Sequence, residues 1–149
     1  MSDITVALGS DRGGFAYKSK LLSHLNDRGI KTIDVGTYVE EVCDYPVFAE
    51  KAGRLVASKE ADYGILICGS GEGMAIAANK VKGVRCGIPY DDEVAALLRQ
   101  HNDANMIAFG AKFMAYEDVE RRTDIFLSTD FLGSYHAERV GMITKMENN

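Results

Sequence analysis

The sequence is poor in the residues that mark extracellular, linker-rich or metal-bound chains. Its 149 residues include no tryptophan, two prolines and three cysteines. Cys43, Cys68 and Cys86 are odd in number and lack C-x-x-C spacing, which argues against a disulfide framework and favours a reducing, cytoplasmic setting. The opening segment MSDITVALGS has no basic or long apolar region typical of a secretory signal. We expect residues 1–149 to form a single compact domain.

The sequence also lacks an excess of basic charge and long apolar runs. The 17 Lys and Arg residues are outnumbered by 22 Asp and Glu residues, for a net charge of −5, which offers no basic surface for nucleic acid. No apolar stretch reaches the roughly 18 residues typical of a membrane span. His24, His101 and His136 have no close spacing, so no metal site is indicated. We therefore expect no nucleic-acid partner, no membrane and no metal.

What the sequence does contain is a regular alternation of short apolar runs with segments of helical periodicity. The runs predict strands at 4–8, 31–35, 63–68, 84–88 and 105–109, and the periodic segments predict helices near 15–28, 46–56, 72–80, 91–100, 116–128 and 134–147. This order is typical of an α/β fold with a five-stranded parallel sheet and helices on both faces. Ligands of such sheets bind beyond the carboxyl ends of the strands.

The segment Cys68-Gly-Ser-Gly-Glu-Gly73 lies at such a strand end. Glycines let backbone amides approach a ligand closely, and the helix expected next adds the partial positive charge of its N-terminus. That field favours the thiolate form of a cysteine, and Ser70 adds a hydroxyl that can donate and accept a proton. The alternative is a buried cysteine at a tight turn without chemistry.

Two other motif families fit this loop less well. A dinucleotide-binding loop has the spacing G-x-G-x-x-G after a first strand, whereas this G-x-G-x-G follows the third. The first loop, residues 9–14, lacks that spacing too. A hydrolase elbow requires G-x-S-x-G, which C-G-S-G-E-G does not match.

Further polar residues are candidates with open alternatives. Asp11 and Arg12 follow the first strand, where they could also be a solvated ion pair. His101 opens the polar segment HNDAN at 101–105, whose hydrogen-bonding capacity favours a function over a purely structural histidine. Tyr45 could face the core or the rim, and Arg139 on the last helix could be an ordinary surface charge.

Six segments in order along nearly the whole chain resemble type B ribose-5-phosphate isomerases and the related galactose-6-phosphate isomerase subunits. They are GSDRGG (9–14), DVGTY (34–38), DYPVFA (44–49), GILICGSGEGMAIAANKVKGVR (64–85), HNDAN (101–105) and HAERV (136–140). The resemblance implies a Rossmann-like three-layer sandwich with a C-terminal helix used in dimerisation. It implies a homodimer or a dimer of dimers whose active sites are shared, with 101–102 and 135–139 coming from the partner. It also implies cofactor-independent aldose–ketose isomerisation of a sugar phosphate through an enediolate.

The resemblance also implies roles for individual residues. The catalytic set is Asp11, Cys68, Ser70 and His101, and the substrate-binding set is Arg12, Tyr45, Gly69, Gly71, Glu72, Gly73, Asn102, Tyr135 and Arg139. Cys68 would move the carbon-bound proton, Ser70 would pass a proton between the two oxygens, and the amides of 69–73 would hold the oxyanion. His101 would open the sugar ring with Asp11 beside it, and Arg139 would bind the phosphate.

Three positions depart from the family pattern. Arg12 stands where histidine is common, Tyr135 where arginine is common, and Glu72 where the residue is usually small or apolar. The first two changes either compensate each other or fit another sugar: a six-carbon phosphate such as galactose, tagatose or allose 6-phosphate, or a free aldose. A catalytically silent partner subunit is the remaining alternative. We expect Glu72 to face solvent or pair with Arg12, because an inward carboxylate would disfavour the thiolate.

Overall fold

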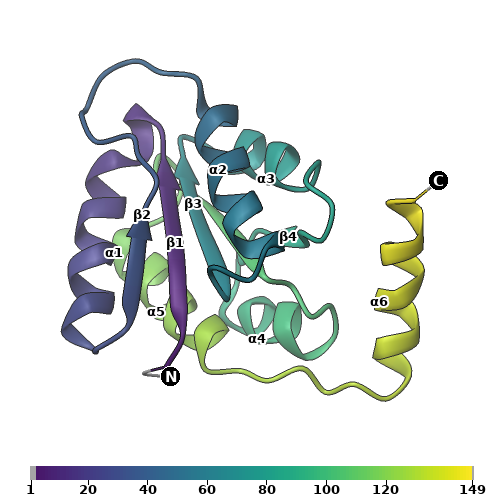
Figure 1. Cartoon of the computed structure of the whole chain (residues 1–149). Helices are drawn as coiled ribbons and strands as arrows, with labels where there is room; N and C mark the ends of the chain where they lie inside the picture. The colour runs from purple at the N-terminus through teal and green to yellow at the C-terminus, as the bar shows by residue number, and fades with distance from the viewer. Residues whose placement is uncertain (1–2, 149) are drawn as a thin grey trace.

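A computed structural model describes residues 3–148 as alternating strands and helices (Figure 1). The elements are β1 (Thr5–Ser10), a 3-10 turn (Arg12–Gly14), α1 (Phe15–Asp27), β2 (Lys31–Asp34), α2 (Tyr45–Ala57), β3 (Tyr63–Cys68), α3 (Glu72–Ala78), β4 (Cys86–Gly87), α4 (Asp92–Gln100), β5 (Met106–Gly110), α5 (Tyr116–Leu127) and α6 (Tyr135–Met146). Each expected strand and helix is confirmed, with shifted ends.

The strands form one parallel sheet in the order β2-β1-β3-β5-β4. The chain moves outward from β1 to β2 and then returns to β3 on the other side of β1. The loops that follow β1 and β3 therefore leave the sheet in different directions, which opens a crevice at their carboxyl ends. Residues 11–14 and 69–71 lie at this crevice.

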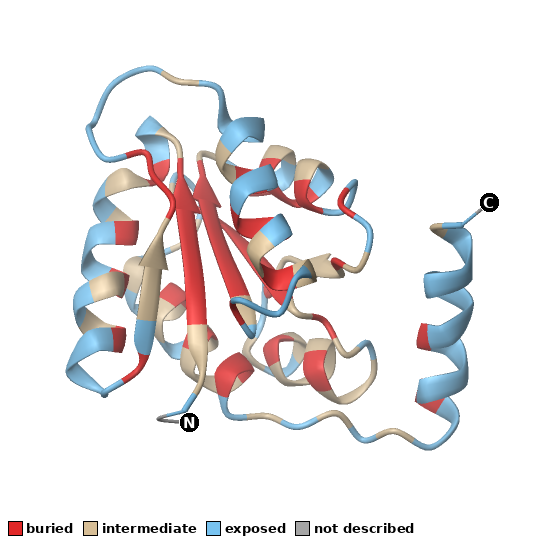
Figure 2. Ribbon diagram, in the orientation of Figure 1, coloured by how far each residue is buried: buried red, intermediate tan, exposed pale blue. Residues whose placement is uncertain are grey.

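Helices cover both faces of the sheet (Figure 1). Apolar residues of α2 and α3 pack with Ala7 and Leu66 on one face, and apolar residues of α1 and α5 pack with Leu8 and Ile67 on the other. The central strands β1, β3 and β5 are buried almost throughout (Figure 2). The predicted Rossmann-like three-layer sandwich is thus confirmed.

Local sequence signals explain where several elements begin and end. Gly29, with φ of +77°, follows α1 as a C-terminal glycine, and Asp91 caps α4 by accepting a 2.8 Å hydrogen bond from the Glu93 amide. The strand expected over 84–88 is wrong in length, because only Cys86 and Gly87 join the sheet edge. No helix within residues 3–148 is long and apolar enough to cross a membrane.

Helix α6 stands apart from the sheet, connected through an extended segment that passes beneath α4 (Figure 1). Among its residues only His136 and Val140 are buried, whereas Met142, Ile143 and Met146 are exposed (Figure 2). A cavity of about 580 Å³ separates its Ile143 and Met146 from Val81, Val84 and Leu98. An exposed apolar face on a helix of this kind is typical of a protein interface.

Candidate functional site

Cys68 is the last residue of β3, near the centre of the sheet. Its sulfur accepts a hydrogen bond of 3.2 Å from the Gly71 amide, and the residue is 5% exposed. Ser70 lies in the exposed part of the same turn, and its hydroxyl oxygen accepts a 3.3 Å hydrogen bond from the Glu72 amide. An N–H group directed at sulfur can stabilise negative charge that develops there during a reaction.

Glycines bring this turn and the first loop into contact. Gly71 has a φ of +84°, and a Cβ there would lie 2.9 Å from the carbonyl carbon of Phe109. A Cβ on Gly14 would overlap the carbonyl oxygen of Ile67, so the first loop packs on the end of β3. Asp11 is fixed there, because its amide donates to Ile67 and its Oδ1 accepts a 3.1 Å hydrogen bond from the Gly14 amide.

A pocket of about 440 Å³ opens at this crevice. Asp11, Arg12, Gly69 and Lys112 line one part of it, and the loop after β2 contributes the rest through Glu40, Val42 and Cys43. Lys112 is held in place by its own amide, which donates a 3.0 Å hydrogen bond to the Gly69 carbonyl. Lys112 was not among the predicted site residues, although its place just beyond a predicted strand could have identified it. The pocket therefore carries two cations, Arg12 and Lys112, and two carboxylates, Asp11 and Glu40.

Tyr45 and Glu72 lie on the side of the turn that leads into α3. The ring of Tyr45 packs so closely on Gly73 that a Cβ on this glycine would lie 2.6 Å from two ring carbons. Tyr45 therefore belongs to the rim of the loop and not to the core. Glu72 is exposed, as expected, and no ion pair joins it to Arg12 in the described chain.

A second group of predicted site residues gathers where α4 ends and α6 begins. The imidazole of His101 stacks on that of His136, with ring centroids 4.2 Å apart and planes 13° apart. Tyr135 packs on His136 at 4.2 Å, and the Arg139 guanidinium lies 4.9 Å from the Tyr135 ring centroid. His136 was not among the predicted site residues, because nothing in their spacing pairs it with His101.

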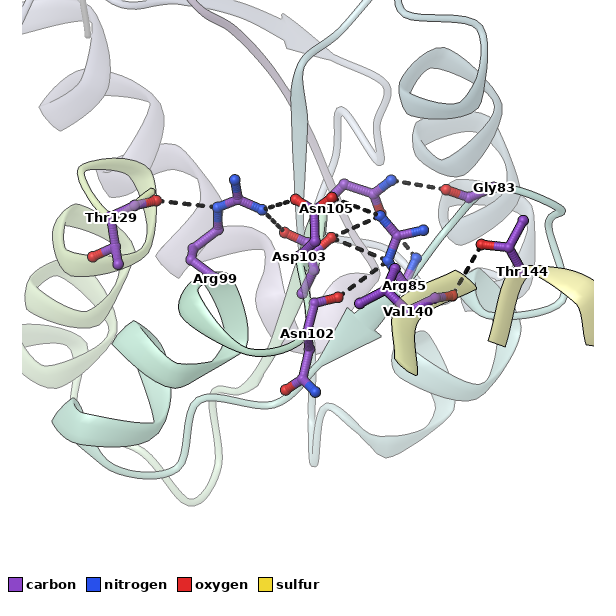
Figure 3. Close-up of polar contacts among 10 residues, drawn as sticks. Gly83, Arg85, Arg99, Asn102, Asp103, Asn105, Thr129, Val140 and Thr144 are labelled. Atoms are coloured by element: carbon purple, nitrogen blue, oxygen red, sulfur yellow. Dashed lines mark hydrogen bonds and ion pairs between the residues drawn. The ribbon is translucent and has the colours of Figure 1, made fainter. Parts of the chain in front are cut away.

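Two arginines hold the polar segment 101–105 (Figure 3). Arg85 donates to the carbonyl oxygens of Asn102 and Asp103, and Arg99 donates to Asp103 Oδ1 and to the Ala104 carbonyl at 2.8 Å each. Asp103 thus has a structural role, whereas the side-chain amide of Asn102 points away from this network (Figure 3). The same bonds fix the backbone that carries His101.

The two groups lie at opposite ends of the strands, one at the amino ends and the other at the carboxyl ends. Met106 at the start of β5 pairs with Gly64, and Gly110 at its end pairs with Cys68. His101 precedes β5 and therefore lies near the amino ends of the strands, whereas Cys68 lies at the carboxyl ends. The two ends of β5 are four residues apart, and a rise of roughly 3.3 Å per residue separates them by about 13 Å along the strand. One copy of the chain does not bring His101 and Cys68 together.

Burial changes the protonation of two groups near these sites. Desolvation raises the pKa of the Cys86 thiol to about 12, so this cysteine stays protonated at neutral pH. Desolvation, followed by the nearby His101 and Arg139, lowers the pKa of His136. Within residues 3–148, no three His, Cys, Asp or Glu side chains are placed to hold a metal ion.

Comparisons with known proteins agree on one family. The model of the ribose/galactose isomerase family matches residues 6–143. Ribose-5-phosphate isomerase B of Escherichia coli K12 is 43% identical over 145 residues, covering 95% of each chain. The structure of Clostridium thermocellum ribose-5-phosphate isomerase B superposes with a TM-score of 0.96 at 40% identity, covering 97% of this chain and 98% of that one. The Mycoplasma genitalium enzyme with bound ribulose-5-phosphate superposes at 0.95, with 33% identity and coverage of 99% and 98%.

Proposed function

The chain belongs to the ribose/galactose isomerase family, and from this we propose that it interconverts ribose 5-phosphate and ribulose 5-phosphate. The observation that carries the proposal is the position of Cys68, at the carboxyl edge of the sheet with an amide N–H directed at its sulfur. Isomerisation of an aldose to a ketose moves one proton between neighbouring carbons. A thiolate at this edge can accept that proton and return it.

Cys68 acts as the base in this scheme. The thiolate takes the proton from C2 of the open-chain aldose, an enediolate forms, and the thiol returns the proton to C1 of the ketose. Ser70, exposed beside the sulfur, passes a proton between the oxygens on C1 and C2. Asp11 hydrogen-bonds the ring oxygen or a hydroxyl group, and Tyr45 borders the sugar chain from the α2 side.

The amides of the turn divide between two tasks. Those of Gly71 and Glu72 already donate to Cys68 Sγ and Ser70 Oγ. Within residues 3–148, the amides of Gly69, Ser70 and Gly73 donate to no protein acceptor, so they are free for the enediolate oxygen. One such donor contributes roughly 2.7–4 kcal/mol of transition-state stabilisation. Gly71 therefore serves the base, and its neighbours serve the oxyanion.

A second copy of the chain completes the site. His101 and Cys68 lie at opposite ends of the strands within one copy, so His101 reaches a sugar at Cys68 only from another copy. The open apolar face of α6, with Met142 and Met146 exposed, supplies the contact surface for a homodimer. His101 of one copy then opens the sugar ring, and Asn102 positions the sugar, in the pocket of the other.

The phosphate is bound by cations from both copies. Arg12 and Lys112 line the pocket beside Gly69, the residue that follows Cys68, and Arg139 enters with the partner's His101. A guanidinium suits a phosphate because it donates two parallel hydrogen bonds. Arg12 thereby replaces the charge lost where Tyr135 stands in place of the family's arginine.

The three free thiols suit a reducing cytoplasm, where we place the enzyme.

Replacing Cys68 by alanine tests the proposal. Conversion of ribose 5-phosphate to ribulose 5-phosphate should fall by a factor of about 10² to 10⁴, the usual contribution of a positioned base. Cys86→Ala is the control, because that thiol lies outside the pocket and should leave kcat nearly unchanged. Retained activity in Cys68→Ala would remove the cysteine from its role.

A substrate panel tests the sugar. We expect kcat/KM to be highest for ribose 5-phosphate, lower for six-carbon phosphates and lowest for free ribose. A preference for galactose or allose 6-phosphate would change the substrate and keep the mechanism, whereas a preference for free sugars would exclude Arg12 as a phosphate ligand. Inactivity of the purified chain towards every sugar would favour a silent partner subunit.

A further inference from the structure

Four side chains form a continuous stack beside the end of α4. The rings of His101 and His136 lie almost parallel, at 4.2 Å and 13°. Tyr135 covers the next position at 4.2 Å and 37°, and the Arg139 guanidinium ends the series 4.9 Å from the Tyr135 centroid. The two outer members are the groups that the proposed function directs at substrate. The two inner members have no assigned duty beyond the family resemblance of Tyr135.

The inner members are well placed to fix the outer ones. His136 is 7% exposed, so its ring is a buried platform on which His101 lies flat. Tyr135 is 56% exposed and lies one helical turn before Arg139, whose side chain folds back over the ring as helical side chains do. A guanidinium over an aromatic face is held by cation–π attraction.

Charge along the stack agrees with this arrangement. Arg139 is permanently charged, and His101 carries a positive charge whenever its imidazole holds the second proton during ring opening. His136 lies between them, and its pKa is lowered by desolvation, by His101 and by Arg139. A neutral imidazole between two cations avoids a third positive charge in contact. The stack can therefore present both outer cations at once.

We propose that Tyr135 and His136 are positioning residues, in which Tyr135 orients Arg139 for the phosphate and His136 orients His101 for the sugar ring. The inference rests on the proposed function, because it assumes that both outer groups meet one sugar phosphate. It gives Tyr135 a task that arginine at this position would not perform: aromatic support for the single guanidinium left on α6. An arginine held in advance loses less rotamer freedom when phosphate binds.

Binding of inorganic phosphate tests the Tyr135 arm. By titration calorimetry, Tyr135→Ala should weaken phosphate binding about two- to fivefold, the range expected from an exposed cation–π contact, and should raise KM more than it lowers kcat. Tyr135→Phe should recover most of that loss, because its ring is kept. Lys145→Ala, an exposed change further along α6, is the control and should bind phosphate as the parent does.

Turnover tests the His136 arm. His136→Ala should lower kcat about tenfold or more, because His101 loses its platform, and His136→Phe should recover much of it. Thermal melting identifies any variant that fails to fold. If an alanine variant does not fold, the matching phenylalanine variant is compared with the parent instead. Equal phosphate binding in Tyr135→Ala and parent, or no recovery by either phenylalanine, would overturn the inference. An inactive parent would instead contradict the proposed function, while the phosphate titrations would still test Tyr135.

Discussion

The ammonium of Lys18 lies 2.6 Å from Oδ1 of Asp34, and the lysine side chain is only 1% exposed. The same ammonium donates to the carbonyl of Thr37. Ser10 exchanges two backbone hydrogen bonds of 2.8 Å with Gly36 and Thr37, so the pair fixes the loop after β2 against the start of the first loop. A buried lysine that does not line the pocket thus supports the position of Asp11.

The two members of this pair should differ in what their loss costs. Asp34→Ala leaves a buried ammonium without its counter-charge, which should lower the free energy of unfolding by about 3–5 kcal/mol. Lys18→Met leaves a carboxylate that is 32% exposed and can be hydrated, so its effect should be smaller. Urea denaturation of both variants measures the difference. Equal losses, or a larger loss for Lys18→Met, would contradict this account of the pair.

The cysteines should differ in reactivity. Desolvation raises the pKa of the half-buried Cys86 thiol to about 12, so it stays protonated up to pH 9 and iodoacetamide should alkylate it slowly despite its exposure. Cys68, whose sulfur receives the Gly71 amide, should be alkylated with loss of activity, and inorganic phosphate in the pocket should slow the reaction. Peptide mass spectrometry with time reports each site separately. Modification of Cys86 at the rate of Cys68 would show that the raised pKa does not protect Cys86.

Acid should destabilise the protein through His136. Its pKa is lowered in the folded chain, mainly by desolvation and then by His101 and Arg139, whereas an unfolded histidine titrates near 6.5. Below about pH 6.5 the unfolded chain therefore binds a proton that the folded chain does not, and stability falls until the lowered pKa is reached. Denaturation between pH 8 and 5 should show this loss in the parent and a smaller loss in His136→Phe. Identical slopes would remove His136 from the acid response.

Substitution by alanine should have opposite effects on stability at two glycines. Gly14→Ala would place a methyl group on the carbonyl oxygen of Ile67, which should lower stability by several kcal/mol and disturb the pocket. Gly141 lies on the exposed side of α6 with nothing within 4 Å, so Gly141→Ala should raise stability by about 0.5–1 kcal/mol. Chemical denaturation of the two variants provides the test. A tolerated methyl at Gly14 would contradict the close approach of the first loop to β3.

Sequence patterns located one half of the candidate site and not the other. Cys68 and Asp11 follow apolar runs, and the rule for parallel sheets places the ends of such runs at one edge. The position of His101 relative to Cys68 was predicted by family resemblance alone, because it depends on the direction in which α4 returns to β5. The contact of His101 with His136 depends on the path of the segment between α5 and α6, which no local periodicity encodes.

The segment 101–105 illustrates a second limit. Its density of polar side chains favoured a functional interpretation, yet Asp103 and Asn105 bond to Arg85 and to neighbouring backbone. Composition alone does not separate side chains that hold a loop from those that the loop presents. Lys112 shows the converse: its place just beyond a strand puts it at the ligand-binding end of the sheet, but only the structure shows that it lines the pocket.

Mixing two inactive variants tests the shared site most directly. Cys68→Ala and His101→Ala are each expected to lack activity, because every site in either homodimer has lost one partner. A mixed dimer would contain one site with both changes and one with neither, so refolding an equal mixture should restore about a quarter of the parent rate. A mixture as inactive as its components would contradict a site that joins Cys68 of one copy to His101 of another.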